Sequence, residues 1–285
     1  MNPPVTLDRE EFIEQAYFFR AFRERLTENM SAQDILSRVN QELLSTTRLP
    51  YAVEFLAAEL KHSGLLANGF SKLPHYFTPF QAYLVKQAED ERSRLTVPAA
   101  LLALEREAIY KANNPSHAGL FVFQFEMISR NRMGYDEGLA AIAGDPFFTK
   151  DWKDYVEIVR LKVGVIDFCD LVYLRSELYV KDVRRSNNTY SPPVPAIYGE
   201  KEGKIAKANR GRDPLFLFAA LQRQLGYPEV PRANLKDSLT QKLDTITTKL
   251  AQLEQRLKLA EGELRGNIDW TEFGTPELLK DLPDA

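Results

Sequence analysis

The sequence has few of the residues that build covalent or metal frameworks, with one cysteine and three histidines among 285 residues. The single thiol, Cys169, excludes an internal disulfide framework and suits a reducing compartment. The glycine-rich phosphate motifs G-x-x-x-x-G-K-[ST] and G-x-G-x-x-G do not occur, nor does a paired C-x-x-C. Nucleotide and zinc sites are therefore disfavoured, and we predict no cofactor.

Long apolar runs are also missing, because no stretch approaches the roughly 18 consecutive apolar residues that a membrane span needs. The first residues, MNPPVTLDREEF, are polar and acidic and lack the apolar centre of a signal peptide. The formal net charge is −3, which gives no general attraction for nucleic acid or an anionic membrane. We therefore expect a soluble cytoplasmic protein without a membrane span.

What the sequence does contain is helical periodicity. Apolar residues recur at spacings of three and four through residues 8–185, and hydroxyl and proline start signals precede several of the runs. The fold class predicted is all-α, with a multi-helix N-terminal domain over residues 1–185. The longest signal runs from Thr149 to about Arg185, and Gly164 is a point at which it could split or bend.

The stretch FVFQFEMISRNRMGYDEGL, residues 121–139, is ambiguous because its phenylalanines alternate with other residues as in a strand. Ser116 can cap a helix start, however, and Gly134 can end one. A lone strand would also leave backbone amides unpaired. We predict a helix that is apolar over most of its surface and hence central in the domain.

Residues 186–233 are rich in proline and glycine and are predicted to be a linker or arm with one short helix at 214–225. Part of this arm, residues 200–212, is basic and could contact phosphate, which leaves nucleic-acid binding open as an alternative function. The segment lacks interleaved aromatic residues, and the protein is acidic overall. The five basic residues are Lys201, Lys204, Lys207, Arg210 and Arg212.

A leucine row marks residues 234–266, which precede an acidic tail at 267–285. Its apolar residues advance by three or four positions, the average period of 3.5 that winds one helix around another. The sequence therefore predicts a coiled coil that joins copies of the chain. The row consists of Leu239, Leu243, Ile246, Leu250, Leu253, Leu257, Ala260 and Leu264.

The charges beside this row favour parallel association. In a parallel pair Lys249 would meet Glu254 across the seam, and Arg256 would meet Glu261. An antiparallel pair would bring cation against cation and acid against acid. A dimer is favoured, while trimers and tetramers stay open, as does a helix that folds back on its own domain.

Two groups of residues are candidates for chemistry. Glu59 and His62 form an E-x-x-H pair, but a helical di-iron site needs two such pairs and two further glutamates, so no metal site is predicted. Arg130 and Arg132 follow the central helix, where they could bind an anion or partner or could simply pair with a nearby acid. No catalytic residue is assigned, because the sequence shows no evident nucleophile paired with a histidine base.

These observations favour a non-enzymatic scaffold or adaptor that self-associates through the parallel coil and presents a helical domain to another protein. The alternative is an enzyme or small-ligand-binding bundle with a pocket between the N-terminal helices. Nucleic-acid binding through residues 200–212 is the second alternative.

Overall fold

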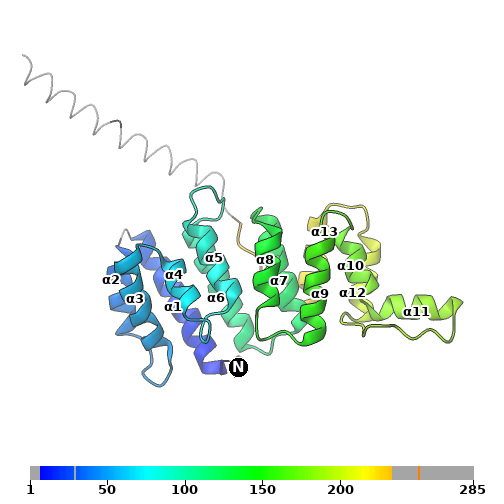
Figure 1. Cartoon of the computed structure of the whole chain (residues 1–285), viewed down its shortest axis with the longest axis horizontal. Coiled ribbons are helices and arrows are strands. Elements are labelled where there is room, and N and C mark those ends of the chain that lie inside the picture. The colour runs from blue at the N-terminus through cyan, green and yellow to red at the C-terminus, as the bar shows by residue number, and fades with distance from the viewer. Residues whose placement is uncertain (1–6, 29, 233–249, 251–285) are drawn as a thin grey trace, which may run out of the picture. The chain divides into compact units, whose positions relative to one another are not determined.

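The computed structural model describes residues 7–28, 30–232 and 250 of the chain (Figure 1). Within them are 13 α-helices and no β-strand, only the isolated bridges Val163↔Ile166 and Ser176↔Tyr198. The all-α prediction is therefore confirmed for this part of the chain. The helices are α1 (Arg9–Thr27), α2 (Ala32–Asn40), α3 (Leu49–Ser63), α4 (Leu66–Lys72), α5 (Pro79–Glu89), α6 (Val97–Ala112), α7 (His117–Arg130), α8 (Tyr135–Ala143), α9 (Lys150–Lys162), α10 (Phe168–Leu174), α11 (Glu177–Ser186), α12 (Glu200–Ala208) and α13 (Pro214–Leu225).

Side-chain caps set several helix starts. The Ser31 hydroxyl accepts a hydrogen bond from the Asp34 amide at the start of α2, at 3.1 Å. Thr78 and Gln81 form a reciprocal capping box at α5, with Pro79 at the first helical position. Each cap satisfies amide groups that a helix start leaves without a partner inside the helix.

The ambiguous stretch is helical, as predicted. Ser116 caps α7 by accepting a hydrogen bond from the Gly119 amide at 3.0 Å. Every residue from Gly119 to Ile128 is buried, because α6, α8 and α13 all pack against this helix. Gly134 precedes α8 rather than ending α7, whose C-terminal cap is Asn131.

The long periodic signal at 149–185 is three helices, α9, α10 and α11. Gly164 divides α9 from α10 with a φ of +89°, a left-handed conformation that L side chains rarely adopt. Asp167 then caps α10, and Ser176 caps α11. The expected bend is thus a full interruption between separate helices.

Residues 186–232 are more ordered than a linker. They contain α12 in addition to α13, and Ala206 and Leu217 have no exposed surface. The segment after α13 is also fastened, because the Tyr227 hydroxyl donates to Glu126 at 2.6 Å and the Asn131 side chain donates to the Pro231 carbonyl at 3.1 Å. The proline and glycine content thus accompanies loops between packed helices.

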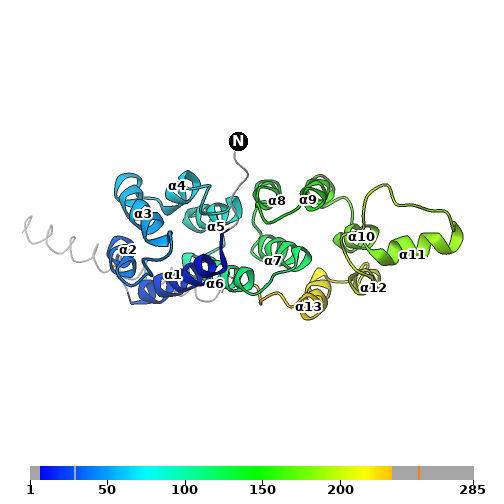
Figure 2. The same cartoon turned by 90° about the horizontal axis from the view of Figure 1, so that it is seen from below.

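The chain divides into two units, Met1–Ala233 and Asn234–Ala285, and we call the first the helical unit. Within it α3, α4, α5, α8 and α9 form one layer, and α2, α1, α6, α7 and α13 form another (Figure 2). Among the described residues, no helix has the length and apolar character needed to cross a membrane. The predicted coil at 234–266 and acidic tail at 267–285 lie outside the described residues, apart from Leu250.

Candidate functional site

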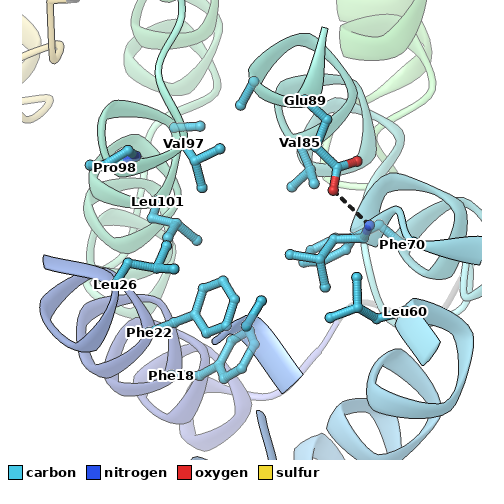
Figure 3. A pocket seen from close by; sticks show the side chains of 15 residues that line it. Phe18, Phe22, Leu26, Leu60, Phe70, Val85, Glu89, Val97, Pro98 and Leu101 are labelled. Carbon is cyan, nitrogen blue, oxygen red and sulfur yellow. Dashed lines mark hydrogen bonds between the residues drawn. The ribbon is translucent and has the colours of Figure 1, made fainter. Parts of the chain in front are cut away.

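An apolar pocket of about 390 Å³ lies between the two layers of the helical unit, bordered by α1, α3, α4, α5 and α6 and by the first residue of α2. Figure 3 shows the side chains of α1 and α6 facing those of α3, α4 and α5 across an open space. We call this space the apolar pocket. Its lining residues are Phe18, Phe22, Leu26, Ala32, Leu60, Gly64, Leu66, Phe70, Val85, Ala88, Glu89, Val97, Pro98, Ala100 and Leu101.

The pocket reaches the surface where the chain turns from one helix into the next. The helices α1, α3 and α5 end at this level, and α2, α4 and α6 begin there. Gly64 ends α3 in a left-handed conformation, with a φ of +75°, and is exposed at the mouth together with Pro98. Deeper side chains are almost covered, as Phe22 is 2% and Phe70 is 3% exposed.

Glu89 is the one acidic side chain in the lining, and both of its carboxylate oxygens are occupied. The Leu66 amide donates to Oε1 at 2.7 Å (Figure 3), and the Ala67 amide donates to Oε2 at 3.0 Å. This carboxylate therefore caps α4, whose own N-cap residue Leu65 makes no side-chain cap. Because both carboxylate oxygens already accept backbone amides, Glu89 has little capacity to bind a ligand.

A buried polar clamp lies at the other end of α6. The Lys111 ammonium is 2.8 Å from Asp145 Oδ2 and 3.1 Å from Glu107 Oε1. All three side chains are at most 2% exposed, and Gln124 also donates to Glu107 Oε1, at 2.7 Å. The clamp joins α6 to α7 and to the turn between α8 and α9.

Burial raises the pKa of the Glu107 carboxyl, and the neighbouring Lys111 charge only partly offsets this. Burial alone would lower the pKa of Lys111, but the carboxylates of Asp145 and Glu107 outweigh it and raise that pKa. The lysine therefore stays charged. Lys111 and Asp145 also line a second cavity of about 290 Å³, together with His75 and Tyr76.

The E-x-x-H pair is not assembled into a metal centre. Glu59 forms an ion pair with Lys72 at 2.6 Å, and His62 is exposed. Within residues 7–28 and 30–232, no group of three or more His, Cys, Asp or Glu side chains could hold a metal ion. The glutamate instead links α3 to α4.

The two arginines after the central helix lie in different environments. Arg130 forms an ion pair with Glu126, and its side chain is only 11% exposed. Arg132 is exposed and has a φ of +53° in the turn that follows α7. Because Glu126 also accepts the Tyr227 hydroxyl, Arg130 belongs to a contact between α7 and the segment after α13.

The basic residues of 200–212 are largely paired within the chain. Lys204 contacts Glu200 at 2.8 Å, Lys207 contacts Asp182 at 2.7 Å, and Arg210 contacts Asp170 at 2.5 Å. Arg210 also stacks over the Tyr173 ring at 4.4 Å from its centroid. The Lys207 contact joins α12 to α11, and the Arg210 contact joins the turn after α12 to α10.

Cys169 is buried. Burial raises the pKa of its thiol to about 12, and the nearby Asp167 charge adds to this. His117 stacks on Trp152 and lies against Phe147, with ring centroids 6.3 and 4.7 Å apart. Neither side chain is arranged as part of a nucleophile and base pair.

Sequence reasoning did not identify the apolar pocket or the polar clamp. The pocket is lined from six helices whose apolar faces resemble ordinary core faces. Glu107 and Lys111 stand four residues apart on α6, but their partner Asp145 lies 34 residues beyond Lys111 along the chain. No protein-family model matches the chain, and neither the curated proteins nor the solved structures contain a significant match.

Proposed function

We propose that the helical unit is a non-catalytic binding module and that the apolar pocket is its ligand site. The observation that carries the proposal is a volume of about 390 Å³ lined by buried apolar side chains. Protein cores are packed with few voids larger than a water molecule. A pocket of this size falls instead in the range of small-molecule sites, roughly 300–1,000 Å³.

Energetics support an occupant. The side chains that face the open space have no protein atoms on that side, so they forfeit dispersion contacts that an apolar occupant would restore. Water that enters through the mouth finds few hydrogen-bond partners, because the lining is almost entirely apolar.

The reactive groups of the helical unit favour binding over catalysis. A thiol whose pKa is raised to about 12, as at Cys169, carries little of the nucleophilic thiolate at neutral pH. Lys111 is held between two carboxylates and stays charged, so its amine is not free to act as a nucleophile or base. Both groups contribute to packing between helices.

The test uses naphthalene, a compact apolar molecule, titrated into the full chain with its fluorescence as readout. We expect saturable binding of one molecule per chain. Leu101→Trp, which places an indole in the pocket, should abolish it, whereas Leu161→Trp on the exposed face of α9 should not. Absence of saturable binding, or equal binding by both variants, would contradict the proposal.

We further propose that copies of the chain associate through the leucine row in a parallel coil, so that the protein acts as an adaptor with several binding modules. The heptad pattern supports this. Leu250 is helical and 55% exposed in the single chain, as a seam residue without its partner helix should be. Each leucine buried by association contributes about 1.5–3 kcal/mol.

Light scattering of the full chain tests the association, with a dimer as the favoured result. Leu250→Glu combined with Leu253→Glu should give monomers with unchanged helicity. The matched control is Ile158→Glu with Leu161→Glu, which also removes two exposed apolar side chains but lies on α9. A monomeric parent chain would contradict the proposed association but would leave the proposed binding function of the apolar pocket unaffected.

A further inference from the structure

We infer that the occupant of the apolar pocket is a linear hydrocarbon chain of about 12–16 carbons, with its polar end left in solvent at the mouth. This inference rests on the proposed binding function of the pocket and specifies its ligand class. It follows from three features of the site, which are its volume, its chemistry and the position of its opening.

The volume sets the size of the occupant. A cavity of about 150 Å³ holds one benzene ring of six carbons. The apolar pocket, at about 390 Å³, is about 2.6 times larger, which corresponds to at most about 16 carbons. A single small aromatic ring would leave more than half of this space empty and forfeit the contacts that favour binding.

The chemistry of the lining excludes a polar occupant from the interior. Apolar side chains from two layers face each other at depth, including Phe22, Leu101 and Val85 (Figure 3). The carboxylate of Glu89 is already held by two backbone amides of α4. A hydroxyl or carboxylate carried into the pocket would lose its hydration without gaining a partner, at a cost of roughly tenfold or more in affinity.

The mouth does not provide a dedicated site for a charged head group either. The helix starts that meet there carry their own caps, which are Ser31 at α2, Thr96 at α6 and Glu89 at α4. The amides that could bind an anion are therefore already used. The head group of the ligand is expected to stay hydrated and to contribute little to affinity.

The depth of the pocket favours a chain over the side of a partner helix. A groove that receives a helix runs along an outer face, whereas this pocket lies between α1 and α6 on one side and α3, α4 and α5 on the other (Figure 3). A flexible chain can enter end-on between the helix termini and extend toward Phe18. A helix, about 10 Å wide with its side chains, cannot do this without separating the layers.

The experiment measures calorimetric affinity of the full chain for octanoate, decanoate, dodecanoate, hexadecanoate and eicosanoate. Affinity should rise up to about fourfold per methylene until the pocket is filled and then level off near hexadecanoate. Hexadecanol and a palmitoyl lysophospholipid should bind within a few-fold of hexadecanoate, since the head group lies outside. Within that range, tighter binding of hexadecanoate would point to a free fatty acid as the source of the chain, and tighter binding of the lysophospholipid would point to a membrane lipid.

Val85→Phe should shorten the preferred chain. It fills about two methylenes of the pocket, so affinity for hexadecanoate should fall at least about tenfold while octanoate binding is kept. The control Ile109→Phe makes a similar change on the exposed face of α6 and should alter nothing. Ala88→Trp, which narrows the mouth from a partly exposed position, provides a second variant if Val85→Phe does not fold.

The outcomes separate this inference from the proposed function. Affinity that is independent of chain length, or that requires the carboxylate, overturns the hydrocarbon-chain inference even if naphthalene binds. Failure of both naphthalene and every chain overturns the binding function as well. A length optimum that moves to shorter chains in Val85→Phe supports both.

Discussion

Helix α6 borders two kinds of buried space, and they differ in how they are filled. Its first half contributes Val97, Ala100 and Leu101 to the apolar pocket, which is open inside. Its second half contributes Glu107 and Lys111 to the polar clamp, where charged and polar side chains are in direct contact. The same helix thus supports an unfilled site at one end and a closed joint at the other.

The difference follows from the cost of burying each type of group. A buried charge must be paired, so the fold brings Asp145, Glu107 and Gln124 around Lys111 and leaves little freedom there. Apolar side chains need no charged or hydrogen-bonding partner. The walls of the pocket can therefore be separated, although the side chains that line it lose packing contacts. The apolar pocket therefore has room to accept a molecule from outside.

Removing the central charge of the polar clamp should have the largest effect. Lys111→Met leaves two buried carboxyl groups without their cation and should lower the free energy of unfolding by about 3–5 kcal/mol. Lys86→Met is the control, because the exposed pair Lys86–Glu137 is worth at most about 1 kcal/mol. Urea unfolding of both variants measures the difference, and equal losses would show that the clamp is not a structural joint.

The loss in Lys111→Met should depend on pH in a defined direction. Burial already raises the pKa of Glu107, and removal of the lysine raises it further. A carboxyl whose pKa is higher in the folded state binds its proton more tightly there, so it favours folding at low pH and loses that contribution as pH rises through the folded pKa. The difference in unfolding free energy between Lys111→Met and the parent chain should therefore shrink as the pH falls toward about 5. A penalty that grows on acidification would contradict this account.

Adding the same volume to the pocket and to the packed core should give opposite results. Val53 has no exposed surface and lines neither cavity, so Val53→Phe should cost about 1–3 kcal/mol by overpacking. Val85→Phe fills open space and should leave the free energy of unfolding unchanged or raise it by up to about 1 kcal/mol. Thermal unfolding of the ligand-free variants compares them, and similar destabilisation by both would mean that the space beside Val85 is closed.

Removing the cap of α4 should have the smallest effect of the series. Glu89→Ala frees the Leu66 and Ala67 amides at the rim of the pocket, which should cost about 1 kcal/mol. Glu91→Ala, at an exposed residue of the following turn, is the control and should stay within about 0.5 kcal/mol of the parent. Chemical denaturation measures both, and no loss in Glu89→Ala would show that water replaces the cap at no cost.

Local signals in the sequence predicted the helices better than their assembly. Thr78, Pro79 and Gln81 mark the start of α5 because capping acts between residues three positions apart. Gly164 marked a break for a similar reason, although its left-handed conformation separates two helices completely. The helix α12 was not predicted, because the prolines and glycines of 186–233 indicate loops. Contacts with α10 and α13, which the local sequence does not reveal, stabilise this helix.

The candidate site could not be predicted in this way because its contacts are long-range. Glu89 caps a helix that begins 23 residues earlier, and Lys111 meets Asp145 across 34 residues. The spacing of Phe18, Phe70 and Leu101 predicts only that each faces a core. Whether these apolar faces pack together or leave a pocket depends on how the two helix layers pack, and the sequence of a single helix does not determine this.

Crystallography under xenon pressure tests the central claim most directly, because xenon enters preformed dry apolar cavities. We predict a xenon atom between the layers, in contact with Phe22, Phe70 and Leu101. Ordered water in that position, or side chains that meet and leave no room for xenon, would contradict the existence of the apolar pocket and with it the proposed binding function.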